Sequence, residues 1–282
     1  MIGSGGGGLA AAAALAKGGM KVVLLEKHNK VGGYMTNFRR GDYRFEVSLH
    51  AMGGLDEGGD TRRVFSDLGI LDRVKPVREN NKAYRTVYPD RVYDTPTDPV
   101  VYEQELKDMF PAEAEGIAKL FQSARDLRVV YRAAVKHLSG DSTDMNQLLA
   151  EQPARVAEFM DYMNNPLSVI LARFIQDPKL VTIFTQISGY AGDAPGTLDA
   201  MLFMLMWGSY HYSGFYNFEG GSQSISDALA DVIRENGGDV RLNTLATRIV
   251  VEDGRAVEVR TQDDACYKTR WVVSNANIPA TI

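Results

Sequence analysis

The sequence predicts an α/β protein whose sheet domain is interrupted by a long, mainly helical insertion. Three observations predict this. The chain starts with a glycine-rich turn, a helix and a buried strand, its middle is rich in helices, and α/β texture returns near residue 216. The composition, 45% hydrophobic and 24% charged, is that of a globular protein. A chain of 282 residues has room for one large domain or two ordinary ones.

The first 33 residues are typical of a β-α-β unit. A helix is expected from about Gly8 to Lys17, because alanine favours helix and Gly18-Gly19 ends it. Lys21–Glu26 is an apolar run that ends in an acid, which is typical of a parallel strand buried on both faces. Only Met1-Ile2 precede the first glycine, so we expect nearly all of the first strand to be missing. Irregular, glycine-rich chain is expected after Gly33.

The texture changes near Asn80, where the insertion begins. A hairpin is expected there, because the runs Tyr84–Tyr88 and Arg91–Asp94 flank the turn Pro89-Asp90. Helices follow, since a proline in the first helical turn is a start signal. Their predicted starts are Asn165-Pro166, Asp177-Pro178 and the residue after Thr197, and the third helix is expected to end near Gly208.

The apolar run Met201–Trp207, which continues through aromatic residues to Phe218, has two interpretations. Flexible methionines and flat rings could line a channel for a long apolar substrate. Alternatively, the run is a buried helix that packs on the rest of the insertion.

The last segment returns to α/β texture. Ser222 or Ser224 is expected to cap a helix that Gly237-Gly238 ends. A short strand, a hairpin around the turn Asp253-Gly254 and one further strand follow. These predicted strands are Val240–Leu242, Arg248–Glu252, Ala256–Arg260 and Cys266–Ser274.

The turn Gly3-Ser4-Gly5-Gly6-Gly7-Gly8 carries the first chemical signal, because its glycine spacing matches a dinucleotide-binding turn. In that pattern the first glycine permits the tight turn, the second lets the backbone approach the pyrophosphate, and the third lets the helix pack closely on the strand. The amides of the helix N-terminus then face the phosphates. Six residues in a Gly/Ala-rich stretch are, by themselves, a weak signal.

Glu26 strengthens the match. It closes the second strand, eighteen residues after Gly8, where the pattern expects an acid that accepts both ribose hydroxyls. A carboxylate there repels a 2′-phosphate, which disfavours NADP. Lys27, the next residue, joins the candidate site. FAD is favoured over NAD because an NAD domain would continue with further βα units, and the α/β texture here resumes only near residue 220.

The stretch from Gly3 to Gly33 resembles the N-terminus of the phytoene desaturase, carotenoid isomerase and retinol saturase group, FAD proteins related to the amine oxidases. Phe45-Glu46-Val47-Ser48-Leu49-His50 is similar to that group's Phe-Asp-x-Gly-x-His segment, from which it departs at Glu46 and Ser48. Gly220-Gly221-Ser222-Gln223, RLNTLATRIVVEDGRAVEV and WVVSNAN near the end are similar as well.

The resemblance implies a split FAD-binding Rossmann-like domain of the GR2 type, formed by residues 1–79 and 216–282, with a mainly helical substrate or cap domain over residues 80–215. It implies that Gly32 and Gly33 lie against the FAD and that Ala246 meets the adenine through its backbone. His50 either approaches the flavin or has a structural role. Relatives continue with a second flavin-contacting segment, so we expect a chain truncated at both ends that binds FAD weakly or not at all by itself.

The chemistry that the resemblance implies is hydride transfer between a C–C bond of an apolar, isoprenoid- or polyene-like substrate and the flavin. Desaturation, saturation and isomerisation all stay open, and no catalytic acid or base is identified. We expect a cytoplasmic enzyme with peripheral membrane contact for substrate uptake. Two rivals stay open: an enzyme that uses NAD alone, and a non-catalytic binding protein on the same fold, like the GDP-dissociation inhibitors.

Several classes of function are disfavoured. A net charge of -5 argues against a nucleic-acid surface, which needs clustered Lys and Arg. A single cysteine, Cys266, forms no internal disulfide, which is typical of a reducing compartment. His28, His137 and His211 have no metal-ligand spacing with one another or with Cys266, so no metal is expected.

Overall fold

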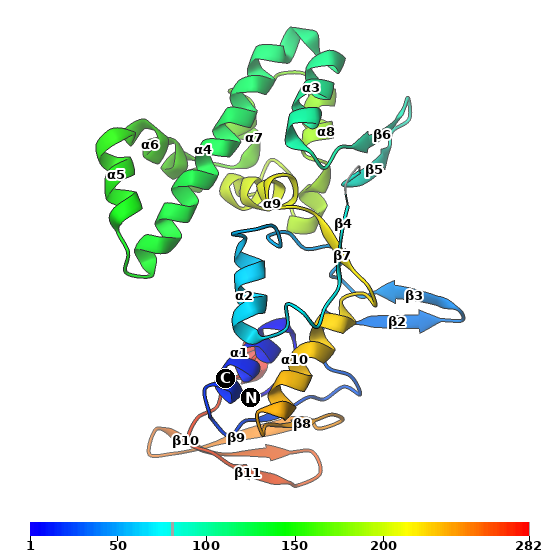
Figure 1. Cartoon of the computed structure of the whole chain (residues 1–282), viewed down its shortest axis with the longest axis vertical. Coiled ribbons are helices and arrows are strands. Elements are labelled where there is room, and N and C mark those ends of the chain that lie inside the picture. The colour runs from blue at the N-terminus through cyan, green and yellow to red at the C-terminus, as the bar shows by residue number, and fades with distance from the viewer. Residues whose placement is uncertain (80–81, 282) are drawn as a thin grey trace. The chain divides into compact units, whose positions relative to one another are not determined.

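The computed structural model describes residues 1–79 and 82–281, and the chain divides into two compact units (Figure 1). Unit 1 is Met1–Arg78 together with Tyr216–Ile282, and unit 2 is Glu79–Phe215. Asn80, where the sequence analysis placed the change of texture, lies outside the described residues. Each unit has its own buried hydrophobic cluster, as expected for separate domains.

A parallel sheet forms the centre of unit 1. β1 (Val23–Leu25) pairs in parallel with β8 (Asp239–Arg241). Ile2 forms parallel bridges to Leu25 on one side and to Ser274 on the other. Met1 and Ile2 therefore lie in the central strand position, with one hydrogen-bonded neighbour from each end of the chain.

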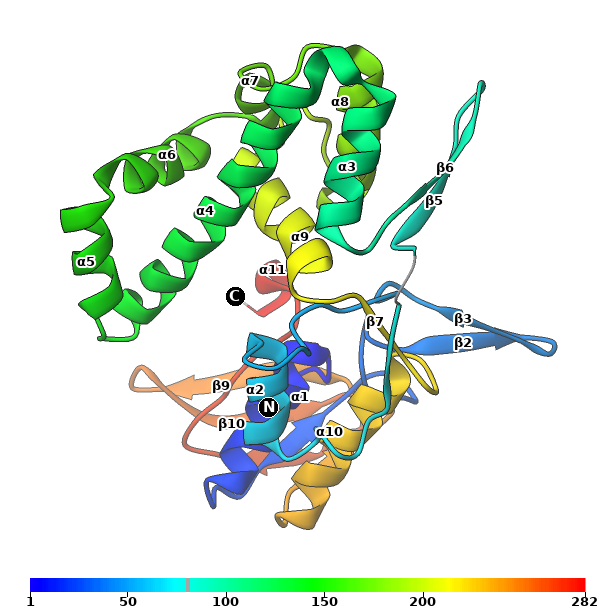
Figure 2. The same ribbon diagram turned by 45° about the horizontal axis from the view of Figure 1, so that its top comes forward.

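The helices α1 (Gly6–Lys17) and α10 (Gln223–Glu235) lie side by side in unit 1 (Figures 1 and 2). The face of α1 that is buried carries alanines, at most 2% exposed, whose small side chains allow close packing. α10 is amphipathic and buries Ile225, Leu229 and Ile233. The two segments of unit 1, far apart in sequence, thus share one core.

The remaining strands of unit 1 are antiparallel. Two-stranded ladders join β2 to β3 and β4 to β7, and β9, β10 and β11 form a three-stranded sheet. Two further helices, α2 and α11, complete the unit. The bounds are β2 Asn37–Arg40, β3 Tyr43–Glu46, α2 Asp60–Leu68, β4 Pro76–Arg78, β7 Tyr216–Phe218, β9 Ala246–Glu252, β10 Arg255–Thr261, β11 Cys266–Lys268 and α11 Ile278–Thr281.

Unit 2 is mainly helical, with one hairpin, β5 (Tyr84–Val87) and β6 (Val92–Thr95), which confirms the predicted hairpin around Pro89-Asp90. Its core is an aromatic cluster centred on Trp207, which is fully buried against Tyr102 and Phe184. The helical elements are α3 Pro99–Met109, η1 Pro111–Glu113, α4 Ala114–Leu138, α5 Thr143–Glu151, α6 Pro153–Asn164, α7 Leu167–Leu171, α8 Pro178–Phe184, η2 Gln186–Ala191 and α9 Ala200–Tyr212.

The predicted end of a helix near Gly208 is wrong, because α9 continues to Tyr212. The Gly208 carbonyl accepts a hydrogen bond of 2.8 Å from Arg128, and the arginine side chain lies where a larger residue would project. Gly208 is therefore a packing position inside the helix. Glycine ends a helix where it adopts a left-handed conformation, and Gly208 is not among the glycines that do so.

Two further expectations about unit 1 are wrong. The chain after Gly33 is not irregular throughout, since it forms the β2–β3 hairpin and α2. Cys266–Ser274 is not one strand: β11 ends at Lys268, and Ser274 pairs separately with Ile2. The residue pattern along a segment does not show where the chain leaves one sheet and pairs with another strand.

Candidate functional site

The glycine turn lies between the central strand position and α1. Gly3 has a φ of 85°, a left-handed conformation that favours glycine. A Cβ atom on Gly8 would lie 2.2 Å from the Gly3 carbonyl oxygen, so only glycine fits where α1 crosses the turn. The helix begins at Gly6, its N-cap residue Gly5 has no capping side chain, and its first amides have no partner within the helix.

Glu26 follows β1 directly, and the structure places it beside this turn. Its side chain is 7% exposed. The Oε2 atom accepts hydrogen bonds from the Ser4 amide at 2.8 Å and the Ser4 hydroxyl at 2.6 Å. The Oε1 atom accepts one from the His28 amide at 2.8 Å. The carboxylate is therefore fixed next to the glycine turn, with further lone pairs available to a ligand.

Gly32 and Gly33 lie against the same turn. The Gly32 amide donates to the Ser4 carbonyl at 2.9 Å, and Gly32 forms a bridge with Gly5. A Cβ atom on Gly33 would approach the Gly5 Cα atom to 3.1 Å. Lys27 is exposed next to Glu26. The structure thus brings together the glycines and the acid that the sequence assigned to one site.

Ala246 begins β9, and the preceding turn lies against the same edge of the sheet. The Thr244 amide donates to the Glu26 carbonyl at 2.8 Å, and the Asn243 amide to the His28 carbonyl at 2.9 Å. The backbone just before Ala246 is therefore tied to the segment that carries Glu26.

Asn275 lies in the segment WVVSNAN and was not among the site residues predicted from the sequence. Its amide donates to the Ile2 carbonyl at 2.8 Å, which places its side chain over the glycine turn. Its Nδ2 atom lies 2.8 Å from the position that a Cβ atom on Gly5 would take, and its Oδ1 atom lies 3.2 Å from the position of a Cβ atom on Gly7. A polar residue directly after a parallel strand, here after Ser274, is the signal that would have found it.

These residues fit the adenine dinucleotide portion of FAD. Uncapped amides at a helix N-terminus are suited to a diphosphate, and the glycine turn leaves no side chain in its way. The fixed Glu26 carboxylate is suited to a ribose diol, to which it offers acceptors. Asn275 adds an amide that could donate to a phosphate oxygen.

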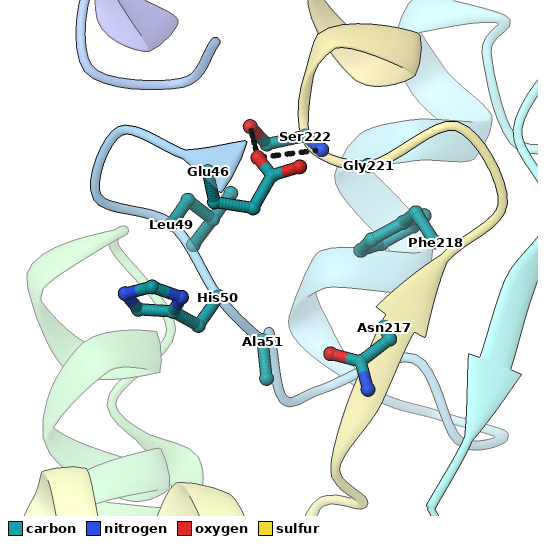
Figure 3. Close-up of a pocket in the computed structure, with 8 residues that line it drawn as sticks. All are labelled: Glu46, Leu49, His50, Ala51, Asn217, Phe218, Gly221 and Ser222. Atoms are coloured by element: carbon teal, nitrogen blue, oxygen red, sulfur yellow. Dashed lines mark hydrogen bonds between the residues drawn. The ribbon is translucent and has the colours of Figure 1, made fainter. Parts of the chain in front are cut away.

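A small pocket of about 210 Å³ lies elsewhere in unit 1, between the end of β3 and the start of α10 (Figure 3). Glu46 closes one end, where Oε2 accepts hydrogen bonds from the amide of Ser222 at 3.1 Å and from its hydroxyl. A Cβ atom on Gly221 would overlap the same carboxylate. The other lining residues are Leu49, His50, Ala51, Asn217 and Phe218.

This pocket explains one departure from the resemblance and corrects one expectation. Glu46 reaches the start of α10, so the longer side chain has a defined contact. Ser222 is the N-cap residue of α10, yet its hydroxyl donates to Glu46 instead of capping the helix. His50 is exposed, and in Figure 3 its ring points away from Glu46. Ser48 is exposed as well.

Other classes of site find no support in the described part of the chain. Within residues 1–79 and 82–281, no three His, Cys, Asp or Glu side chains lie close enough to hold a metal ion. In the same ranges, no helix combines the length and the apolarity that crossing a bilayer requires.

Comparison with known families gives one match over almost the whole chain. Residues 7–280 match the family described as flavin containing amine oxidoreductase. Among curated relatives, a 4,4'-diapophytoene desaturase (4,4'-diapolycopene-forming) from Methylomonas sp is 27% identical over 284 residues, which are 98% of this chain and 53% of the relative. An all-trans-retinol 13,14-reductase from Danio rerio is 26% identical, over 99% of this chain and 47% of the relative.

A prolycopene isomerase from Arabidopsis thaliana is 25% identical, over 98% of this chain and 47% of the relative. The chain thus spans about half the length of the curated relatives it matches. Solved structures share its fold. An oxidoreductase from Methanosarcina mazei has a TM-score of 0.67 at 20% identity, with 95% of this chain and 56% of that chain covered. A Rab GDI from Plasmodium falciparum has a TM-score of 0.59 at 11% identity, covering 95% and 63%.

Proposed function

The chain belongs to the flavin containing amine oxidoreductase family, and from this premise we propose that unit 1 binds FAD for hydride transfer to or from a C–C bond of an apolar polyene. The single observation that carries the proposal is the contact between Glu26 and the glycine turn through Ser4. It joins the two recognition elements of an adenine dinucleotide, one for the diphosphate and one for the ribose.

The residues of this chain have binding and positioning roles in the proposal. The amides of Gly6 and Gly7 hold the diphosphate, Glu26 the ribose hydroxyls, and the segment at Ala246 the adenine. When bound, FAD supplies the acceptor or donor of the hydride, and the protein orients it and excludes water. Precise placement of two reactants contributes much of the rate in such a reaction.

The polyene part of the proposal follows the names of the relatives, which include a diapophytoene desaturase, a prolycopene isomerase and a retinol reductase. We assign substrate contact to unit 2 as a cap. Its helix α9 is apolar over most of its length, and Leu202 on it is 53% exposed, while Leu205 and Met206 on the same face are half-buried and pack against the core. An apolar chain would cover this face.

Replacement of Glu26 tests the cofactor site. We expect Glu26→Ala to weaken FAD binding at least tenfold, because a charged hydrogen-bond partner contributes about 1.5–3 kcal/mol. His50→Ala should change it less than about twofold, on the order of 0.4 kcal/mol, because the His50 ring is exposed. Titration of each variant with FAD, followed by quenching of flavin fluorescence, measures the ratio even where binding is weak.

Glu26→Gln is the matched control, since the amide keeps the size of the side chain and an acceptor for Ser4. It should bind FAD with intermediate affinity. Equal affinities for Glu26→Ala and His50→Ala would count against the ribose assignment. A chain that binds NAD and leaves flavin fluorescence unchanged would favour the enzyme that uses NAD alone.

A non-catalytic binding protein is the second candidate, and one observation favours it: the fold is shared with a Rab GDI. The two candidates differ in what happens to bound flavin. Without oxygen, an enzyme changes the visible absorbance of oxidised flavin when it takes hydride from the added polyene, or of flavin reduced beforehand when it gives hydride to it. A carrier binds the polyene with the flavin spectrum unchanged in both cases. The polar contacts of Glu26 favour the enzyme, since a lipid carrier has no need of a ribose site.

A further inference from the structure

The β2–β3 hairpin of unit 1 has two faces of different chemistry. Its register pairs Phe38 with Phe45 and Arg40 with Tyr43, so these four side chains share one face. The two phenylalanine rings stack with centroids 5.4 Å apart, and the Arg40 guanidinium lies 5.0 Å from the Phe38 centroid. Tyr43 is 73% exposed. This face presents aromatic surface to solvent.

The opposite face of the hairpin is cationic toward its tip, while Asn37 and Glu46 occupy its base. Arg39 and Arg44 are directly opposite each other across the ladder, and both are exposed. Like charges in this position repel, which destabilises a hairpin. No acidic side chain within residues 1–79 and 82–281 forms an ion pair with either of them. An external anion would remove the repulsion.

We propose that this hairpin binds the surface of an anionic phospholipid bilayer. The occupant has to accept aromatic side chains and neutralise arginines at once, and the interfacial zone of such a bilayer does both. A nucleic acid offers phosphates without an apolar phase, and the net charge of -5 opposes it. The inference rests on the proposed function only in that a polyene substrate is stored in membranes.

The hairpin is anchored firmly to unit 1 at its base. The Asn37 side chain donates to the Gly220 carbonyl at 3.2 Å, and the Lys30 ammonium donates to the Asn37 carbonyl at 3.1 Å. Glu46, the last residue of β3, is bound to Ser222. Both strands are thus attached at the base, and the tip, Gly41-Asp42, lies at the far end of the ladder. Figure 2 shows the β2–β3 hairpin extending away from its base. β3 therefore runs from the tip of the hairpin to the pocket of Figure 3, which Glu46 lines.

Co-sedimentation with vesicles tests the proposal, with phosphatidylcholine vesicles compared to vesicles that also contain phosphatidylglycerol. We expect the chain to bind the anionic vesicles and to be released by salt. Arg39→Gln with Arg44→Gln should weaken partitioning about thirtyfold, since each basic residue near an anionic surface contributes about fivefold. Tyr43→Ser, at an exposed position, should weaken it severalfold without a change in charge.

Arg132→Gln with Arg255→Gln is the matched control, because both residues are exposed and the net charge changes equally. It should bind as the unchanged chain does. Equal losses in the control and the hairpin variant, or no binding to anionic vesicles at low salt, would overturn the proposal. So would a concentration-dependent dimer that the hairpin variant abolishes in the absence of vesicles.

FAD titration of the same proteins separates this inference from the proposed function. The hairpin variants should keep the FAD affinity of the unchanged chain, because none of the replaced side chains contacts the glycine turn or Glu26 in the described structure. A chain that binds FAD and ignores vesicles would refute the hairpin assignment alone. A chain that binds vesicles through the hairpin without binding FAD would refute the proposed function alone.

Discussion

Gly8→Ala should weaken FAD binding about a hundredfold and destabilise unit 1. Alanine inside a helix is usually about 1 kcal/mol more favourable than glycine. Here its Cβ would stand 2.2 Å from the Gly3 carbonyl oxygen, which is backbone and cannot rotate away. Either α1 shifts or the turn opens, and overpacking of this kind costs about 3 kcal/mol. If this cost is taken from the free energy of FAD binding, because FAD requires the undistorted turn, the affinity falls about a hundredfold.

The control for this prediction lies two residues earlier. An added Cβ on Gly6 would meet only the terminal methyl group of Met35, at 3.5 Å, an ordinary contact. Gly6→Ala should therefore leave the thermal stability unchanged or slightly raised. Thermal unfolding of both variants gives the comparison, because the Gly6 amide is itself assigned to the diphosphate. If both variants behave alike, close packing of α1 on the turn is not what requires glycine at position 8.

The sequence predicted which residues lie beside the glycine turn better than it predicted the fold around them. A glycine turn, a buried strand and an acid at the end of that strand are local signals. Their spacing along the sequence is enough to place them relative to one another in a β-α-β unit. That is why Glu26, Gly32 and Gly33 could be assigned to one place, and the structure brings them together. A polar residue directly after a strand marks Asn275 as a candidate, but its place over the turn depends on the pairing of Ser274 with Ile2 across almost the whole chain, which that local signal does not specify.

The β2–β3 hairpin shows why the fold was harder to predict. Alternation of buried apolar and exposed polar residues predicts a strand with one face in the core. Neither face of this hairpin is buried, and its aromatic side chains are exposed. Gly208 is the opposite case, a residue with a strong local preference that a tertiary contact with Arg128 overrides.

Unit 2 should lose stability between neutral and mildly acid pH because of His211. This residue is 4% exposed, with its ring stacked on Tyr102 at a centroid distance of 5.1 Å and tilted against Trp207 at 4.6 Å. Neither ring nitrogen has a hydrogen-bond partner of ordinary geometry among the described residues. Burial lowers the pKa of His211 to about 4, and the carbonyls of Thr97 and Pro96 offset this only in part.

The sign of the effect follows from which state binds the proton. The unfolded chain protonates this histidine below its ordinary pKa of 6.5, whereas the folded unit keeps it neutral down to about 4. The contribution to stability is therefore complete above pH 6.5 and is lost as the pH falls toward 4. Over that interval it amounts to about 3 kcal/mol.

His211→Phe isolates this contribution, because it keeps an aromatic ring against Tyr102 and Trp207 and removes two buried nitrogens without partners. At neutral pH the variant should be as stable as the unchanged chain or more stable, since unpaired buried polar atoms are costly. Between neutral pH and about pH 4.5, its free energy of unfolding should fall by about 2–3 kcal/mol less than that of the unchanged chain. Urea unfolding followed by the fluorescence of Trp207 measures both, with Trp271, which is 75% exposed, replaced by phenylalanine in each protein. Identical pH profiles would mean that another group of unit 2 drives the acid loss and that His211 is solvated or paired in the folded state.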